Sequence, residues 1–191
     1  IHFIRFIKEL KKESCKVIVQ CSEEAQTLID NQKWIDTSII GNEYPDHDFY
    51  IPIGSLMNVL KYNPNHHLQD FPYIEVDREK KDRSRSKPLD IGLVFATDKS
   101  SSAHDDESIN PKLFQNIFTD SQNIICLDRH LTKDSVPEYC NKAFNYSNFY
   151  ELSQQLCKLD IIITVDHLVA HLAGALNIDT ILLLPCVPNW R

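Results

Sequence analysis

The chain has 191 residues, a length that fits one large domain or two small ones. Its hydrophobic content of 42% can form a core, and its formal charge of −7 argues against nucleic acid and anionic membrane surfaces as partners. With only 4 Gly we expect no glycine-rich phosphate loop, and no apolar run approaches the roughly 18 residues that span a bilayer.

The 6 Cys form no C-x-x-C pair, and several fall inside predicted strands or helices. A zinc or disulfide framework would need paired spacings. We therefore expect reduced, mostly buried thiols, as is typical of a cytoplasmic protein. The chain opens at Ile1 inside an amphipathic helical pattern and closes directly after Trp190, so we expect a piece of a longer polypeptide.

Helix and strand patterns alternate in the first part of the chain. We expect helices over residues 1–12, 22–31 and 55–60, and strands over 16–20, 34–40 and 48–53. Ser22 is the expected N-cap of the second helix, with Glu23 and Glu24 in its first turn, where acidic side chains complement the helix dipole. Such alternation predicts an α/β fold.

A polar stretch over residues 77–90 separates this part from a second alternation. Its basic residues suggest a nucleic-acid segment, but interleaved acids cancel much of the charge. We expect a solvated linker between two α/β lobes, residues 1–76 and 91–191.

In the second part we expect strands over residues 91–96, 123–127, 160–165 and 180–184, and helices over 111–118, 149–159 and 167–176. The runs at 160–165 and 180–184 are apolar on both faces, which favours strands buried on both sides. Polar loops follow the first two of these strands, over residues 97–107 and 128–130.

Polar side chains gather where the strand at 160–165 gives way to a helix. Asp166 is the expected N-cap, and Asn177 the expected stop. His167 and His171 stand four residues apart and therefore share one helix face. In open α/β sheets, ligands bind at the carboxyl ends of strands, against helix N-termini. The stretch thus predicts a site for a phosphate-bearing ligand.

Structural roles are the alternatives for these residues. Asp166 can be a plain N-cap, and the two histidines can be packing or surface positions. The histidine spacing also suits a metal, but no Glu follows His167 and no third ligand is evident, so we expect no metal. Gly174 is expected to let the helix approach the sheet, and His66-His67 to lie in a loop.

The stretch Asp160–Leu176 closely resembles a signature of glycosyltransferase family nine, the heptosyltransferase-like enzymes. It is most similar to the version found behind tetratricopeptide repeats in bacterial proteins. Leu183-Leu184-Pro185 and Pro188-Asn189-Trp190-Arg191 match the end of that pattern, and Ile91–Ala96 resembles the strand that opens the family's second domain.

The resemblance implies a GT-B-like fold with two Rossmann-like α/β lobes, the N-terminal acceptor-side lobe being incomplete. It implies transfer of a hexosyl or heptosyl group, without a cofactor, from a nucleoside diphosphate sugar to a hydroxyl acceptor on a glycan, lipid or protein. The donor-binding residues that it implies in the C-terminal, nucleotide-sugar-binding lobe are Thr97, Lys99, Asp128, Arg129, Asp166, His167 and His171.

The chain departs from the family pattern at three places. His167 replaces the usual Thr after the signature acid. The loop that usually carries glycine and basic residues carries Asp105-Asp106-Glu107, opposed by Lys99 and His104. The family's general base would precede Ile1, so we expect this chain alone to be inactive. A non-catalytic descendant or fragment, acting as a ligand- or protein-binding module, is therefore the alternative.

Overall fold

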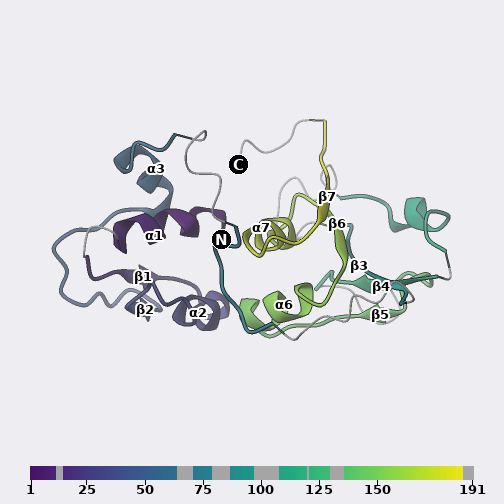
Figure 1. The fold of residues 1–191 in the computed structure, drawn as a ribbon, viewed down its shortest axis with the longest axis horizontal. Coiled ribbons are helices and arrows are strands. Elements are labelled where there is room, and N and C mark those ends of the chain that lie inside the picture. Colours follow the sequence, from purple (N-terminus) through teal and green to yellow (C-terminus); the bar gives the residue numbers. More distant parts are fainter. Residues whose placement is uncertain are drawn as a thin grey trace.

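The computed structural model describes residues 1–11, 15–63, 71–78, 87–96, 108–119, 121–129 and 136–186. Its elements form two lobes along the longest axis of the molecule, each with its own parallel sheet (Figure 1). No strand of one sheet pairs with a strand of the other in the described ranges.

The first lobe contains a short sheet and several short helices. Its elements are η1 (His2–Phe6), α1 (Ile7–Leu10), β1 (Ile18–Gln20), α2 (Glu23–Asp30), β2 (Thr37–Ile39), η3 (Ile53–Ser55) and α3 (Leu56–Val59). β1 and β2 pair in parallel, and α2 is the crossover between them. The helix predicted over residues 1–12 begins as a 3₁₀ helix and becomes α-helical only at Ile7.

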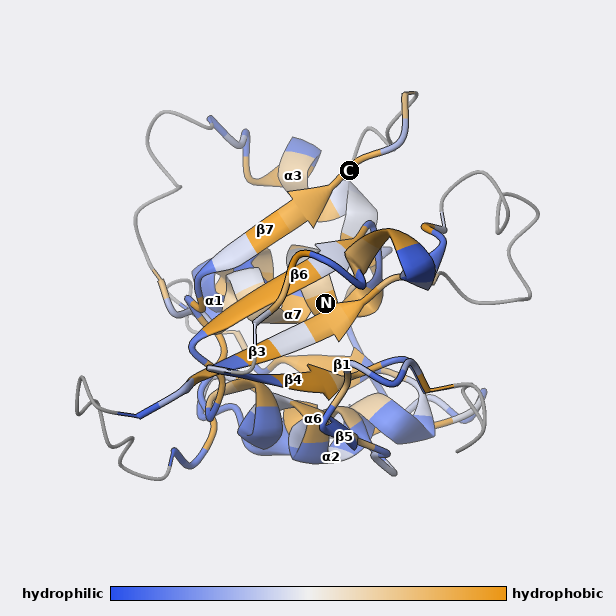
Figure 2. Ribbon diagram, turned by 90° about the vertical axis from the view of Figure 1, so that its right-hand side faces the viewer, coloured by the Kyte–Doolittle hydropathy of each residue, from blue (hydrophilic) through white to orange (hydrophobic). Residues whose placement is uncertain are grey.

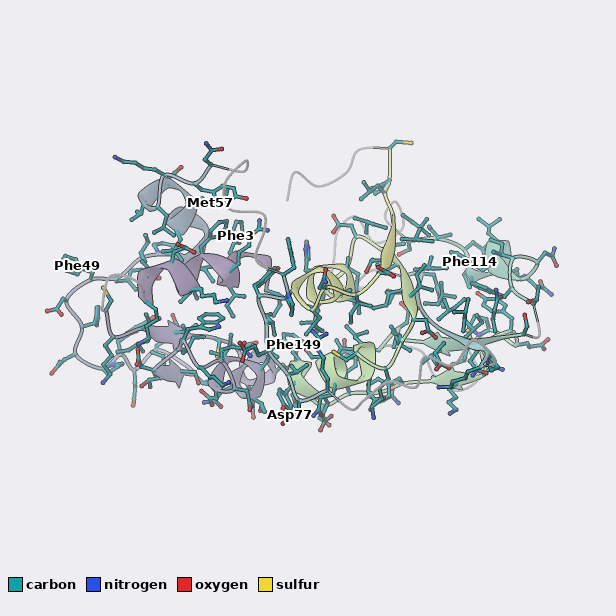
Figure 3. All side chains as sticks on the ribbon, in the orientation of Figure 1. Phe3, Phe49, Met57, Asp77, Phe114 and Phe149 are labelled. Carbon is teal, nitrogen blue, oxygen red and sulfur yellow. The ribbon has the colours of Figure 1, made fainter. Side chains whose placement is uncertain are left out.

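The strand predicted over residues 48–53 is wrong. These residues find no partner strand, and Phe49 is 94% exposed at the outer end of the lobe (Figure 3). Pro52, which lacks an N–H group for a ladder bond, instead precedes the 3₁₀ helix η3. Ile51 of this run packs against the core, but without a neighbouring strand the run forms no ladder of hydrogen bonds.

The second lobe is a five-stranded parallel sheet with helical cover. Its elements are β3 (Leu89–Val94), η4 (Pro111–Phe114), β4 (Gln122–Cys126), β5 (Lys142–Ala143), α6 (Phe149–Leu156), β6 (Ile161–Val165), α7 (Leu168–Ala175) and β7 (Thr180–Leu183). The strand order is β5-β4-β3-β6-β7. β4 and β5 are added on one side of β3, and β6 and β7 on its other side, so the strand order reverses between β3 and β6. The two-residue β5 carries exposed side chains, so no hydrophobic pattern predicted it.

Helices α6 and α7 lie between this sheet and the first lobe (Figure 1). Their buried leucines, among them Leu152, Leu156 and Leu172, belong to a core that also contains Phe6 and Leu28 of the first lobe. On the opposite face, Phe114 of η4 covers Ile91 and Leu93. Full burial of such a side chain stabilises the fold by about 1.5–3 kcal/mol.

β7 differs from the strand that its sequence predicts. Its apolar side chains suggested burial on both faces, yet it is an edge strand, paired with β6 alone within the described part of the chain. Ile181 is 47% exposed and Leu182 44%. Figure 2 shows this hydrophobic strand at the margin of the sheet.

The chain passes from one lobe to the other through residues 71–78, here called the junction segment. The N–H groups of Tyr73 and Ile74 donate to the carbonyl of Ala175 (3.0 and 3.3 Å), and the Arg78 guanidinium donates to the carbonyl of Leu176 (2.7 Å). These carbonyls end α7, where a helix lacks internal partners and favours a cation. The junction segment is therefore bonded to the second lobe at the amino-terminal edge of its sheet.

Candidate functional site

The candidate site lies at the carboxyl ends of β3, β4 and β6. The register places Val94 opposite Thr164, and Leu93 opposite Cys126, so the three strands end nearly level. This edge includes the point between β3 and β6 at which the strand order reverses. Ligands of open α/β sheets bind at such a point.

His167, rather than the predicted Asp166, is the N-cap of α7. Its backbone is extended (φ −141°, ψ 163°), and its Nδ1 accepts a hydrogen bond from the Val169 N–H (3.3 Å). Only an unprotonated Nδ1 can accept this bond, so the cap requires a neutral imidazole with its proton on Nε2. Asn177 has a left-handed backbone (φ 58°) just after the helix, as its predicted role as a stop requires.

Asp166, which is not the cap, lies beside the side chain of His171. Its Oδ1 lies 3.7 Å from Nε2 of His171, within ion-pair distance when the imidazole is protonated. Both side chains are partly exposed. A cation in the first turn of a helix opposes the helix dipole, and the carboxylate of Asp166 offsets this. An imidazolium held in this way can donate to an anionic oxygen.

Asp128 faces the backbone rather than open space. It is 8% exposed, and its two carboxylate oxygens accept from the N–H groups of Phe95 and Ala96 (3.2 Å each). The Cys126 thiol donates to the same carboxylate (3.7 Å). A hydrogen bond with Cys140 and burial raise the pKa of the Cys126 thiol. Asp128 thus fixes the backbone just after β3.

Arg129 reaches across to the first lobe. Its guanidinium carbon lies 5.2 Å from the centre of the Tyr146 ring, and its Nη1 lies 2.5 Å from Oε1 of Glu24. Glu24 belongs to the first turn of α2, directly after the carboxyl end of β1. Sequence reasoning missed both Glu24 and Tyr146. Glu24 could have been found from its position just after the end of a strand, since the same kind of position indicated Asp166.

The predicted donor-binding residues fall into two groups and a remainder. Asp166, His167 and His171 come together at the start of α7, and Asp128 and Arg129 follow β4. β3 lies between these groups, so about 10 Å separates their strands. Thr97 and Lys99 lie outside the described residues, as do His66, His67, His104, Asp105, Asp106, Glu107 and residues 188–191.

Gly174 does not approach the sheet, in contrast to the expectation. A Cβ atom built on it meets nothing within 4 Å. The glycine with a close approach is Gly92 in β3, where a Cβ would lie 2.6 Å from Leu159 Cδ1 and 2.8 Å from Leu127 Cδ1.

Within the part of the chain that the structure describes, no three His, Cys, Asp or Glu side chains converge as a metal site would require. The helices of that part are all too short or too polar to cross a bilayer.

Comparison with known proteins gives no match to a family model and none to a curated protein. Solved structures do resemble the chain. One is the dodecameric iron-containing heptosyltransferase TibC in complex with ADP-D-beta-D-heptose, with a TM-score of 0.54 and 14% identity over 95% of this chain and 53% of that chain. Another is the dodecameric iron-containing glycosyltransferase TibC from enterotoxigenic E. coli H10407, with a TM-score of 0.55 and 13% identity over 94% of this chain and 52% of that chain.

The chain has a glycosyltransferase-like fold of the GT-B type. It spans about half the length of the TibC chains, which agrees with an incomplete first lobe. At 13–14% identity the likeness concerns the fold alone. Membership of family nine and association with tetratricopeptide repeats stay predictions.

Proposed function

We propose that this chain is part of a glycosyltransferase of family nine that transfers a sugar from a nucleoside diphosphate sugar to a hydroxyl acceptor. The observation that carries the proposal is the Asp166–His171 pair at the start of α7, beside the reversal of strand order between β3 and β6. In support, one TibC structure of the same fold is a complex with ADP-D-beta-D-heptose.

In this reaction the acceptor oxygen attacks the anomeric carbon, and the bond from that carbon to the diphosphate oxygen breaks. The leaving diphosphate takes the electron pair, so negative charge grows on it in the transition state. Donors placed at that charge lower the barrier. The N–H groups at the start of α7 and the imidazolium of His171 would supply them, with Asp166 as the residue that positions His171.

The remaining residues have supporting roles in this proposal. Asp128 holds the end of β3. Thr97 and Lys99, which follow this strand in the sequence, would contribute a hydroxyl and a cation to the diphosphate. The base that accepts the acceptor's proton would come from a segment before Ile1. Residues 77–90 would divide an acceptor-side lobe from the donor-binding lobe.

A second candidate is a ligand- or protein-binding module without catalysis. The observation in its favour is that Arg129, a predicted donor-binding residue, is already paired with Glu24 of the first lobe. The two candidates share the nucleotide site and differ in turnover.

Titration calorimetry with ADP, UDP and GDP tests the shared site. We expect millimolar or tighter binding of one of them. His171→Gln should weaken it at least fivefold, whereas His47→Gln in the exposed loop of the first lobe should leave it unchanged. Absence of binding by all three at millimolar concentration would refute the proposal.

Turnover separates enzyme from binding module. We expect sugar transfer or donor hydrolysis by the parent protein and none by residues 1–191 alone, because removal of a general base costs a factor of roughly 10²–10⁴. Turnover by this chain would place the base within it. A parent that binds the donor without turnover would favour the binding module.

A further inference from the structure

The contact between Glu24 and Arg129 joins the two lobes at the edge that carries the candidate site. The two residues are 105 positions apart, and the Nη1–Oε1 distance is 2.5 Å. Arg129 follows the carboxyl end of β4, and β4 lies directly beside β3. The reversal point between β3 and β6 is therefore about 7 Å, one and a half strand spacings, from β4. An arginine side chain can span that distance.

The contacts around Arg129 would allow its guanidinium to change its anionic partner while it stays in place. The guanidinium lies over the ring of the buried Tyr146, 5.2 Å from its centre, and this cation–π contact keeps it near the second lobe. Glu24 and Arg129 are 41% and 36% exposed, and ion pairs so open to water contribute little to stability. The carboxylate can thus be replaced at small cost.

The lobes are held differently at the two edges of the second sheet. At the amino-terminal edge, the junction segment is bonded through Tyr73, Ile74 and Arg78 to the end of α7. At the carboxyl edge, Glu24–Arg129 is a side-chain contact open to water. Loss of this pair would remove a polar contact between the lobes at the edge at which the ligand site lies, while the backbone bonds of the other edge and the shared core remain.

We propose that Arg129 exchanges Glu24 for the diphosphate of the donor, so that donor binding releases this contact between the lobes. This inference rests on the proposed function. A diphosphate carries more negative charge than one carboxylate, and it accepts two parallel hydrogen bonds from a guanidinium. Glu24 then acts as a built-in competitor that lowers the affinity for the donor.

Calorimetry with ADP and with inorganic pyrophosphate tests the competition. Glu24→Gln should raise the affinity for both by about two- to fivefold, the equivalent of one exposed ion pair. Glu23→Gln is the matched control, since it removes the same charge from the same helical turn, and it should change the affinity by much less. Arg129→Met should weaken binding, and Glu24→Gln should bring no gain in the Arg129→Met background.

The distance between spin labels on the two lobes gives a second measurement. The labels are placed at exposed Glu43 and Asn145, which lie just beyond the carboxyl ends of β2 and β5. We expect this distance to lengthen when pyrophosphate is added and to be already longer in Glu24→Gln without ligand. If ADP binds but Glu24→Gln and Glu23→Gln behave alike, or if the distance is insensitive to pyrophosphate, the exchange is overturned while the proposed function stands. If His171→Gln leaves ADP binding intact, the proposed function fails instead.

Discussion

The side-chain amide of Gln32 hydrogen-bonds both backbone groups of Glu75. Its Nε2 donates to the Glu75 carbonyl (3.0 Å), and its Oε1 accepts from the Glu75 N–H (2.9 Å). Gln32 is only 1% exposed and follows α2 closely, so the pair bonds the junction segment to the first lobe. Together with the bonds to Ala175 and Leu176, it holds this segment from both sides.

Replacement of this amide should be costly. Gln32→Met keeps the side-chain length but leaves the N–H and carbonyl of Glu75 without their partner, at about 1–3 kcal/mol for each buried group. We expect urea unfolding to show a loss of about 2–4 kcal/mol. Gln115→Met, at an exposed position of the second lobe, should change stability by less than about 0.5 kcal/mol. Equal effects of the two changes would contradict the role of the pair.

The two glycines of the second lobe should respond to alanine with opposite signs. Gly92→Ala forces a methyl group against Leu159 and Leu127 and should destabilise the protein by about 1–3 kcal/mol. Gly174→Ala meets open space within α7 and should stabilise it by about 0.5–1 kcal/mol, because alanine restricts the unfolded chain. Thermal unfolding of both variants measures the difference. A loss of stability in Gly174→Ala would mean that the helix is more crowded than the structure shows.

Acid should weaken the first lobe through Asp36. Hydrogen bonds from the Lys11 ammonium and from the Val17 N–H lower the pKa of this carboxyl below its usual value. A lowered folded-state pKa means that the stabilisation is complete above the unfolded-state value of about 3.9 and is lost as the pH falls through the folded-state pKa. The stability difference between the natural chain and Asp36→Asn should therefore shrink below about pH 4. A difference that is constant from pH 6 to pH 2 would rule this out.

The cap at His167 predicts which substitutions α7 tolerates. His167→Ala removes the acceptor for the Val169 N–H and should cost about 0.5–2 kcal/mol, whereas His167→Thr supplies a hydroxyl at the same position and should cost less. Chemical unfolding compares the two variants. Identical stabilities would show that the imidazole contributes nothing as a cap.

The strand and helix of residues 160–177 could be predicted because a β-branched run and a four-residue leucine spacing leave little choice there. The cap was misplaced by one residue, since Asp166 and His167 both carry acceptors and only the backbone angles decide between them. The edge position of β7 depends on what lies beside it, which its own composition does not encode.

Contacts between distant parts of the chain could not be predicted from the sequence. The pairing of Glu24 with Arg129 and of Gln32 with Glu75 depends on how the lobes face each other, and a single sequence carries no local pattern for that. The bonds that Asp128 makes within the protein were not predicted, for a related reason. Its position after a strand suggested a ligand contact. In the structure its carboxylate accepts hydrogen bonds from the backbone N–H groups at the end of the neighbouring strand β3.

The shared core of the two lobes limits their modularity. Phe6 and Leu28 of the first lobe are buried in one continuous core with Leu156 and Leu172 of α6 and α7. A second lobe produced by itself would present the apolar sides of these two helices to water, and would need solubilising substitutions there. A chimaera that exchanges one lobe for that of a glycosyltransferase of the same fold would have to carry over the helix faces along with the lobe.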